Sequence, residues 1–204
     1  MPTVDMKRTE FVRRRYNRNA LFYDRMDRMV KDDWRRRLTS QAKGRVLEIG
    51  IGTGKNLGLY DPAVTRELVG IDLSPGMLAR ARAKTASVPV TLLEMDAQRM
   101  SFPDASFDTV LATCVFCTVP DPVLGLKEAR RVCKPGGRIL LLEHVRIDKP
   151  VVGPLMDLLD PLAASLIGTH INRRTVENVR LAGLTIERVE NIKGNLIKLI
   201  VAKP

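Results

Sequence analysis

The pattern of apolar and polar positions changes period repeatedly along the chain after residue 44. Short apolar runs, typical of buried strands, are separated by segments in which apolar residues recur at helical spacing. Strands and helices in alternation predict an α/β fold, in which a mostly parallel sheet has helices on both faces. The expected strands are 45–49, 67–71, 89–94, 107–113 and 137–142, and the expected helices are 54–60, 75–84 and 122–133.

The C-terminal part of the chain has a different pattern. A helix is expected after Asn172, extending to Leu181, and two alternating runs follow it at 184–190 and 195–202. We expect these two runs to pair as a hairpin, which would extend the sheet to seven strands. The sequence therefore predicts one α/β domain over residues 41–204.

Residues 1–40 are expected to form an arm of basic amphipathic helices in front of this domain. Apolar residues recur at helical spacing over 22–38, with arginines between them, and an earlier short helix contains Phe11 and Tyr16. Residues 1–45 hold 14 Lys or Arg against 6 Asp or Glu, so most of the net charge of +11 lies there. Such an arm suits an anionic membrane surface or an anionic polymer, and the alternative is a solvated helix face.

Residues 150–168 form an apolar insertion between the last parallel strand and the following helix. Pro154 and Pro161 are expected to break it into one or two short helices, and Asp157 and Asp160 argue against a membrane span. We expect it to cover the mouth of the site at the carboxyl ends of the strands. A buried scaffold helix is the alternative.

Composition limits the setting in which this protein works. Apolar and charged fractions of 45% and 28% are ordinary for a globular chain, and the longest uncharged apolar run is too short to cross a bilayer. No secretory signal is visible, and three cysteines argue against a disulfide framework. Cytoplasmic localisation is therefore expected. Cys114 and Cys117 have no second pair with which to form a zinc site, so packing is their expected role.

A glycine-rich turn follows the first expected strand, in the segment VLEIGIGTGKN. Its glycines, Gly50, Gly52 and Gly54, alternate with other residues, so that a ligand can approach the backbone closely. Asp72 ends the second strand, where its carboxylate would accept hydrogen bonds from two ribose hydroxyls. This layout predicts a site for a nucleoside-bearing cofactor.

Ligands of parallel sheets lie beyond the carboxyl ends of the strands. There the backbone of Gly50, Ile51 and Gly52 is expected to face the ligand. Leu73 would pack on an adenine ring, and Asp96 would accept a hydrogen bond from its amino group. Ser74 is expected to cap the next helix, with Pro75 at its first position.

Four segments, VLEIGIGTGKN, GIDLSPGML, LEMDAQRMSFPDASFDTV and KPGGRILLLEHV, resemble successive motifs of the class I S-adenosylmethionine-dependent methyltransferases. The resemblance spans about residues 45 to 145 and implies a Rossmann-like seven-stranded sheet. It also implies S-adenosylmethionine as the methyl donor and no metal. The cofactor-binding residues expected on this basis are Tyr23, Glu48, Gly50, Ile51, Gly52, Asp72, Leu73, Asp96, Ala97 and Thr113.

Two narrower families share parts of the sequence. YDRMDRMVKDDWRRRL and the body resemble the ubiquinone and menaquinone C-methyltransferases, whereas CVFCTVPDP and LLLEHV look closer to bacterial phosphatidylethanolamine N-methyltransferases. Microsomal thiol methyltransferase-like proteins are also similar. Glu48 replaces the Asp that the quinone enzymes would have. The expected function is therefore N-methylation of phosphatidylethanolamine, with methylation of a quinone precursor or of another lipophilic amine or thiol as the alternative.

The lipid interpretation assigns further residues. His144 is the expected proton acceptor for the amine, or else a hydrogen-bonded group that does not touch the substrate. Tyr16 and Tyr23 would form a lid with aromatic faces for a methylated ammonium, or would pack as ordinary rings. Residues of the segment after the insertion would bind the lipid phosphate, with surface solvation as their alternative. They are His170, Asn172, Arg173 and Arg174.

The expected partners are a lipid substrate and the anionic inner face of the membrane, which a monomer would contact peripherally through its arm. Two other functions remain open. The basic arm also suits RNA methylation, but aromatics make up only 4% of residues, which leaves few stacking platforms, so no nucleic acid is expected. A non-catalytic module that binds the cofactor is the other possibility.

Overall fold

The computed structural model describes residues 4–21, 23 and 30–204. Seven strands form one sheet in the order β3-β2-β1-β4-β5-β7-β6. β1 to β5 are mutually parallel, and β7 runs antiparallel to both of its neighbours, so the predicted terminal hairpin is present. The strands are β1 Gly44–Ile49, β2 Thr65–Asp72, β3 Val90–Glu94, β4 Phe107–Thr113, β5 Cys133–His144, β6 Thr185–Lys193 and β7 Ile197–Lys203.

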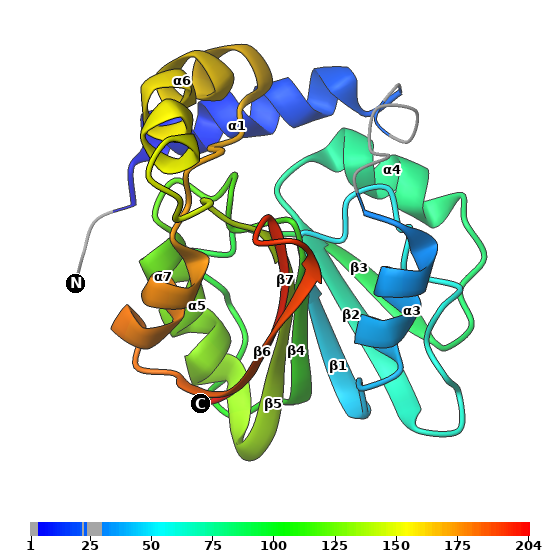
Figure 1. Ribbon diagram of the computed structural model, residues 1–204. Helices are drawn as coiled ribbons and strands as arrows, with labels where there is room; N and C mark the ends of the chain where they lie inside the picture. The colour runs from blue at the N-terminus through cyan, green and yellow to red at the C-terminus, as the bar shows by residue number, and fades with distance from the viewer. Residues whose placement is uncertain (1–3, 22, 24–29) are drawn as a thin grey trace.

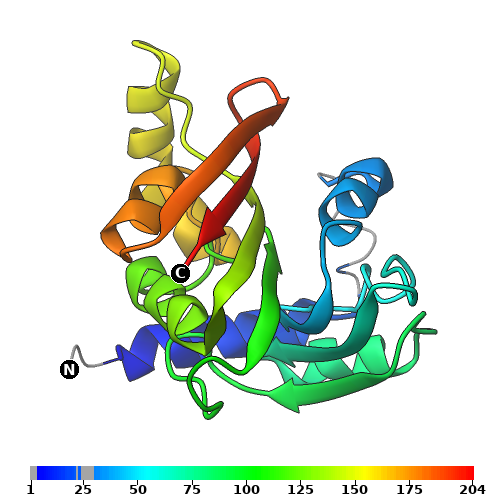
Figure 2. The same cartoon turned by 90° about the horizontal axis from the view of Figure 1, so that it is seen from below.

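Helices lie on both faces of this sheet, as Figures 1 and 2 show. On one face α5 and α7 cover a core of alternate strand residues, and on the other α3, α4 and the turns after β1 cover a second core. The predicted Rossmann-like α/β fold is therefore confirmed. The helices are α1 Met6–Asn19, α3 Asp32–Thr39, α4 Pro75–Arg82, α5 Pro122–Val132, α6 Val152–Ile167 and α7 Thr175–Leu181.

The strand order reverses between β1 and β4, because the chain leaves β1 toward β2 and β3 and later returns to the other side of β1. In an open parallel sheet this switch point leaves a crevice at the carboxyl ends of the strands. α1 crosses the same end of the sheet above β1 and β2 (Figure 1). The fold thus leaves a crevice between the sheet and the first helix.

The helix predicted over 54–60 is wrong. Residues 52–58 instead form consecutive turns. Gly52 and Gly54 have φ values of +57° and +79°, and a right-handed helix cannot include such residues. The helix predicted over 75–84 is present as α4, with the Ser74 side chain accepting from the amide of Met77 and Pro75 as the first residue.

The prediction for the N-terminal arm is only partly tested. α1 contains the predicted Phe11 and Tyr16. Within the predicted helix 22–38, residues 22 and 24–29 lie outside the described residues. Val30 and Lys31 are not helical, because the extended Lys31 is the N-cap of α3, so one continuous helix over 22–38 is wrong.

The apolar insertion folds as one long helix, α6, and the expectation that prolines break it is wrong. Pro154 lies in the first turn, where a missing N–H removes no intrahelical hydrogen bond. Pro161 lies inside the helix and removes one such bond. None of the helices that the structure describes is long and apolar enough to cross a membrane.

Candidate active site

The glycine turn after β1 forms the floor of the candidate site. Gly50 has φ +64°, and a Cβ at this position would lie 2.5 Å from the Val115 side chain. Gly52 has φ +57°, but a Cβ there would meet no protein atom closer than the Gly50 carbonyl oxygen at 4.0 Å. Gly50 is therefore required by packing, and Gly52 leaves open space above the turn.

Asp72 joins this turn to the end of β2. Its Oδ2 accepts from the amide of Gly52 at 2.9 Å, and its Oδ1 accepts from the amide of Ser74 at 2.8 Å. Burial raises the pKa of this carboxyl group to about 6, against the effect of the backbone hydrogen bonds. Each oxygen retains a lone pair, so the carboxylate can also accept from a ligand hydroxyl.

These residues open into a cleft whose empty space, counted together with its open mouth, is about 720 Å³. The sheet ends form its floor and α1 its roof. Nine of the predicted site residues line it. They are Tyr16, Tyr23, Gly50, Gly52, Asp72, Leu73, Asp96, Ala97 and Thr113.

The roof of the cleft is attached to the loop after α6 and to α4 by polar contacts. Tyr16 of α1 has its hydroxyl 3.1 Å from Oγ1 of Thr169, and its ring lies 5.9 Å from that of Tyr23. Burial raises the pKa of Tyr16, so the hydroxyl stays protonated. Asn17 accepts from the amide of Gly76 at the start of α4. α1 is therefore held in place over the cleft.

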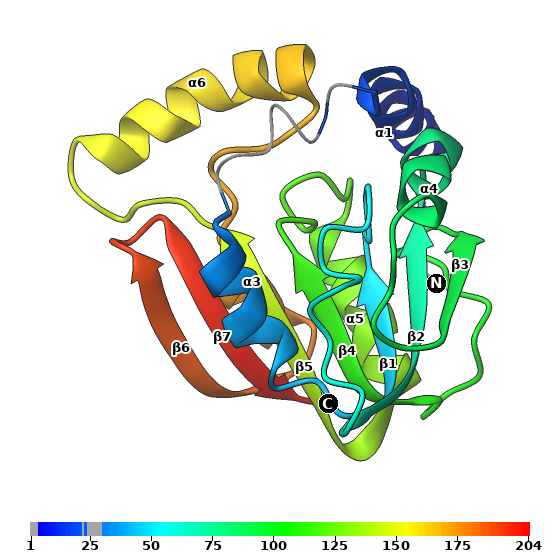
Figure 3. The same cartoon turned by 90° about the vertical axis from the view of Figure 1, so that its right-hand side faces the viewer.

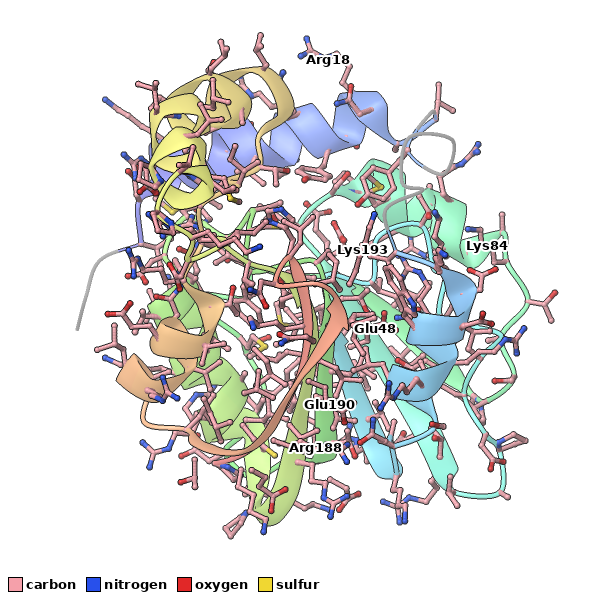
Figure 4. All side chains as sticks on the ribbon, viewed as in Figure 1. Arg18, Glu48, Lys84, Arg188, Glu190 and Lys193 are labelled. Atoms are coloured by element: carbon pink, nitrogen blue, oxygen red, sulfur yellow. The ribbon has the colours of Figure 1, made fainter. Side chains whose placement is uncertain are left out.

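Glu48 and Ile51 do not line the cleft. The carboxylate of Glu48 accepts from Tyr60 Oη and from Asn56 Nδ2, each at 2.7 Å. Burial raises its pKa to about 7. Figure 4 shows Glu48 in the interior, close to α3. The Ile51 side chain instead packs on Gly70, where a Cβ would lie 2.3 Å from it.

Sequence reasoning missed the role of Glu143 at the end of β5. This buried carboxylate accepts from the amides of Val115 and Phe116 at 2.9 and 3.3 Å through Oε1, whereas Oε2 has no hydrogen-bond partner within the described part of the chain. Burial raises its pKa to about 7. The loop it holds includes Cys114, at φ +52°, and lines one wall of the cleft. The only signal in the sequence was an acidic residue at a strand end.

His144 lies at the end of β5, buried, and it does not line the cleft. Burial lowers its pKa, which keeps the imidazole neutral. Its Nδ1 has no hydrogen-bond partner among the residues that the structure describes. Because side chains alternate between the two faces of a strand, His144 and Glu143 point to opposite sides of the sheet.

The residues predicted to bind the lipid phosphate lie outside the cleft. His170 Nδ1 is 2.8 Å from Asp160 Oδ2, and Asn172 donates to Asp157 at 3.2 Å. Arg173 donates to the Val119 carbonyl oxygen, and Arg173 and Arg174 line a separate open hollow beside α7. His170 and Asn172 thus connect the loop after α6 to α6 itself, and Arg173 connects this loop to the segment after β4.

Several lining residues were not predicted. Except for Arg13, their side chains are apolar or neutral and carry no pattern that separates them from core residues, because only the tertiary structure turns them toward one space. They include Val12, Arg13, Ser74, Met77, Met95, Val115, Thr118 and Val119.

The sequence matches the methyltransferase domain family over residues 47–141, from β1 to β5. The chain is also 42% identical over 168 residues to phosphatidylethanolamine N-methyltransferase of Cereibacter sphaeroides, covering 78% of this chain and 80% of that protein. This chain belongs to the S-adenosylmethionine-dependent methyltransferases. The resemblance inferred from the four motifs is confirmed.

Two further comparisons agree with this family. Demethylmenaquinone methyltransferase of Deinococcus radiodurans is 39% identical over 132 residues, which cover 59% of this chain and 55% of that protein. An S-adenosylmethionine-dependent methyltransferase from Mesorhizobium loti has the same fold, with a TM-score of 0.66 at 21% identity. The match covers 84% of this methyltransferase and 96% of the other.

The lining of the cleft fits S-adenosylmethionine, the methyl donor of this family. Gly52 leaves space for close approach, Asp72 offers a carboxylate for a pair of ribose hydroxyls, and Leu73 and Ala97 are apolar neighbours for a flat base. Within the residues that the structure describes, no group of three or more His, Cys, Asp or Glu side chains is arranged to hold a metal ion.

Proposed function

We propose that this methyltransferase N-methylates the head group of phosphatidylethanolamine at a membrane surface, toward phosphatidylcholine. The observation that carries the proposal is the 42% identity to a phosphatidylethanolamine N-methyltransferase, which extends over 78% of the chain. The match reaches well beyond a domain core of 47–141, so it includes segments outside the cofactor motifs.

In the proposed complex Asp72 accepts from the ribose hydroxyls, Asp96 accepts from the adenine amino group and Leu73 packs on the ring. The backbone of Gly50 and Gly52 lies along the methionine part, and Thr113 closes the far side. Bound S-adenosylmethionine supplies an activated methyl group on a good leaving group. The task of the protein is therefore to orient the amine and to remove its proton.

Tyr16, in the roof, is proposed to orient the amine, because its hydroxyl is protonated and its ring face suits a methylated ammonium. His144 is the proposed proton acceptor, since its lowered pKa keeps the ring neutral. Because it does not line the cleft, the proton would have to reach it through an intervening water or side chain. His170, Asn172, Arg173 and Arg174 lie together after α6 and offer cationic and amide donors that suit a lipid phosphate.

The acceptor lipid lies in a bilayer, so the protein must reach its surface. We propose that the basic arm, residues 1–40, provides this contact on the inner face of the membrane, as a lid beside the cleft. Apolar burial combined with attraction between arginines and anionic head groups gives reversible binding. Removing residues 1–30 is expected to weaken sedimentation with anionic vesicles, and unchanged sedimentation would exclude the arm from docking.

The test is transfer of label from methyl-labelled S-adenosylmethionine to defined acceptors. Vesicles containing phosphatidylethanolamine should yield labelled mono-, di- or trimethylated lipid, whereas vesicles of phosphatidylcholine alone should not. Asp72→Ala serves as the control for enzyme-dependent transfer. Label in RNA, or binding of S-adenosylhomocysteine without transfer to any acceptor, would overturn the lipid assignment.

C-methylation of a quinone precursor is the second candidate. It is favoured by the 39% identity to a demethylmenaquinone methyltransferase, although the chain covers only 55% of that protein. The same assay with a demethylated naphthoquinol in place of the lipid separates the two. Transfer to the quinol with none to phosphatidylethanolamine would replace the lipid proposal.

A further inference from the structure

α6 presents its apolar side to solvent. The exposed large apolar residues recur at helical spacing, so they form one stripe along the helix. Leu158 is 74% exposed and Leu162 is 57% exposed. The stripe consists of Val151, at the N-cap, and Val152, Leu155, Leu158, Leu159, Leu162 and Leu166.

The opposite side of α6 is attached to the body by polar contacts. Asp157 pairs with Arg146 at 2.7 Å. Asp160 is buried and accepts from His170 Nδ1 and from the amide of Ile171. Among the residues that the structure describes, no apolar side chain of α6 belongs to either core cluster. The helix therefore has the reverse of the usual arrangement, with carboxylates inward and leucines outward.

α6 lies at the end of the molecule where the cleft opens. Its C-terminal end reaches α1, since a Cβ at Gly168 would lie 3.6 Å from Arg15 and 3.9 Å from Tyr16 of the cleft roof. His170, just after α6, donates its amide to the Cys117 carbonyl oxygen in the loop after β4. Figure 3 shows α6 and α1 both beyond the ends toward which the parallel strands point.

Basic residues of α1 accompany this apolar stripe. A surface groove on α1 combines four cationic side chains with one carboxylate and two exposed apolar residues, Met6 and Phe11. Figure 4 shows Arg18 on the side of α1 that faces away from the sheet. The cationic members of the groove are Lys7, Arg14, Arg15 and Arg18.

We infer that the stripe on α6 inserts into the interface of an anionic bilayer while the cationic side chains of α1 contact its head groups. The inference rests on the proposed lipid acceptor, and it identifies the surface by which the cleft is presented to the membrane. At 16 residues α6 is about 24 Å long and lies along the surface rather than across it. Leucines beside arginines are complementary to the acyl chains and phosphates of a lipid layer, whereas RNA has no apolar chains that would bury the stripe.

The test compares the full chain with the double variant Leu158→Glu/Leu162→Glu in sedimentation with vesicles of phosphatidylcholine, phosphatidylethanolamine and phosphatidylglycerol. Leu181→Glu on α7 is the matched control, since Leu181 is also exposed, at 61%, but lies away from α6. Removing two leucines that would be buried in the bilayer should weaken partitioning into vesicles roughly 100-fold, and the control should bind as the unchanged chain does. Equal binding by the double variant would overturn the inference.

Two readouts show that the double variant is folded and that its effect is specific. Its thermal unfolding and its calorimetric binding of S-adenosylhomocysteine should match those of the unchanged chain. In a second test, Arg14→Gln/Arg18→Gln should weaken binding only to vesicles that contain phosphatidylglycerol. The inference would be overturned if the unchanged chain bound no vesicles but self-associated without lipid, and if Leu158→Glu/Leu162→Glu abolished that self-association. The stripe would then be a contact surface for a second copy of the chain.

Failure of this inference is distinguishable from failure of the proposed function. If the double variant still methylates vesicle phosphatidylethanolamine at the unchanged rate, α6 is excluded from docking, but the assignment of phosphatidylethanolamine as the substrate stands. If vesicle binding depends on the stripe but no methyl group is transferred to phosphatidylethanolamine, the docking surface is supported and that substrate is excluded.

Discussion

The amide of Gly52, in the turn after β1, donates to the carboxylate of Asp72 at the end of the neighbouring strand β2, at 2.9 Å. This hydrogen bond connects the two groups that the sequence singled out for binding a nucleoside. It both orients the carboxylate and fixes the conformation of the turn, so the nucleoside site is preformed before a ligand binds.

Asp72→Ala should abolish measurable binding of S-adenosylhomocysteine. Two hydrogen bonds from ribose hydroxyls to a carboxylate contribute about 3 kcal/mol or more together, which corresponds to at least roughly a 100-fold loss of affinity. Isothermal titration calorimetry measures it. Asp72→Asn, which keeps one acceptor oxygen, should retain part of the affinity, and equal binding by Asp72→Ala and the unchanged protein would exclude Asp72 from the site.

Gly52→Ala and Gly136→Ala should separate backbone strain from ligand exclusion. Both glycines have positive φ, +57° and +80°, and an added Cβ would clash with no protein atom at either position. Each variant should lose about 1 kcal/mol of unfolding free energy. Only Gly52 lines the cleft, so only Gly52→Ala should also weaken S-adenosylhomocysteine binding, by at least roughly tenfold. Equal binding by the two variants would show that the ligand does not approach Gly52.

Tyr60→Phe should lower the free energy of unfolding by about 1–3 kcal/mol, because it leaves the buried Oε2 of Glu48 without a donor. The pKa of Glu48, already raised to about 7 by burial, should rise further, since the Tyr60 hydrogen bond lowers it. Urea unfolding measures the loss. In the double variant Glu48→Gln/Tyr60→Phe the two effects should not add, and simple additivity would mean that the pair is not coupled.

Glu143→Gln should change how stability depends on pH. The pKa of Glu143 is raised from 4.5 to about 7 in the folded protein, so the folded state binds more protons than the unfolded chain between these values. Stability from this group is complete below about pH 4.5 and is lost as pH rises through about 7. The variant should match the unchanged protein at pH 5 and be more stable at pH 8.

The rise of this pKa from 4.5 to about 7 sets an upper limit on the order of 3 kcal/mol for this difference. Thermal and urea unfolding at both pH values measure this stability difference. Comparing the variant with the unchanged protein at the same pH removes the contributions of the other titrating groups, which both proteins share. A difference that does not grow with pH would mean that Glu143 remains ionised when buried. Glu143→Ala, which also removes the acceptor for Val115 and Phe116, should be destabilised at both pH values.

His144→Gln should lower kcat at pH 7 by roughly 10²-fold if this neutral imidazole removes the amine proton. Because His144 does not line the cleft, S-adenosylhomocysteine binding should not change. If the pH profile of kcat is unchanged in His144→Gln, His144 does not accept the proton and acts only as a buried packing group at the end of β5.

The sequence alone determined the sheet and the position of its main site. Strand positions follow from short apolar runs, and the glycine turn and Asp72 follow from backbone freedom and from where parallel strands end. These are local properties, so the residues that line the cleft at positions Gly50, Gly52, Asp72 and Asp96 could be predicted. The helix expected at 54–60 was wrong, because the positive φ values of Gly52 and Gly54 allow only turns there.

The tertiary structure decided which side chains face which neighbours. Glu48 belongs to the glycine motif, yet Tyr60 and Asn56 hold it beneath the cleft. Glu143 supports the loop after β4 because β4 and β5 lie side by side, a relationship between positions 28 residues apart. α6 turns its leucines outward because Arg146 and His170, outside the helix, bind its carboxylates. Local periodicity fixes where a stripe lies on a helix, but only long-range polar pairing fixes the direction in which it points.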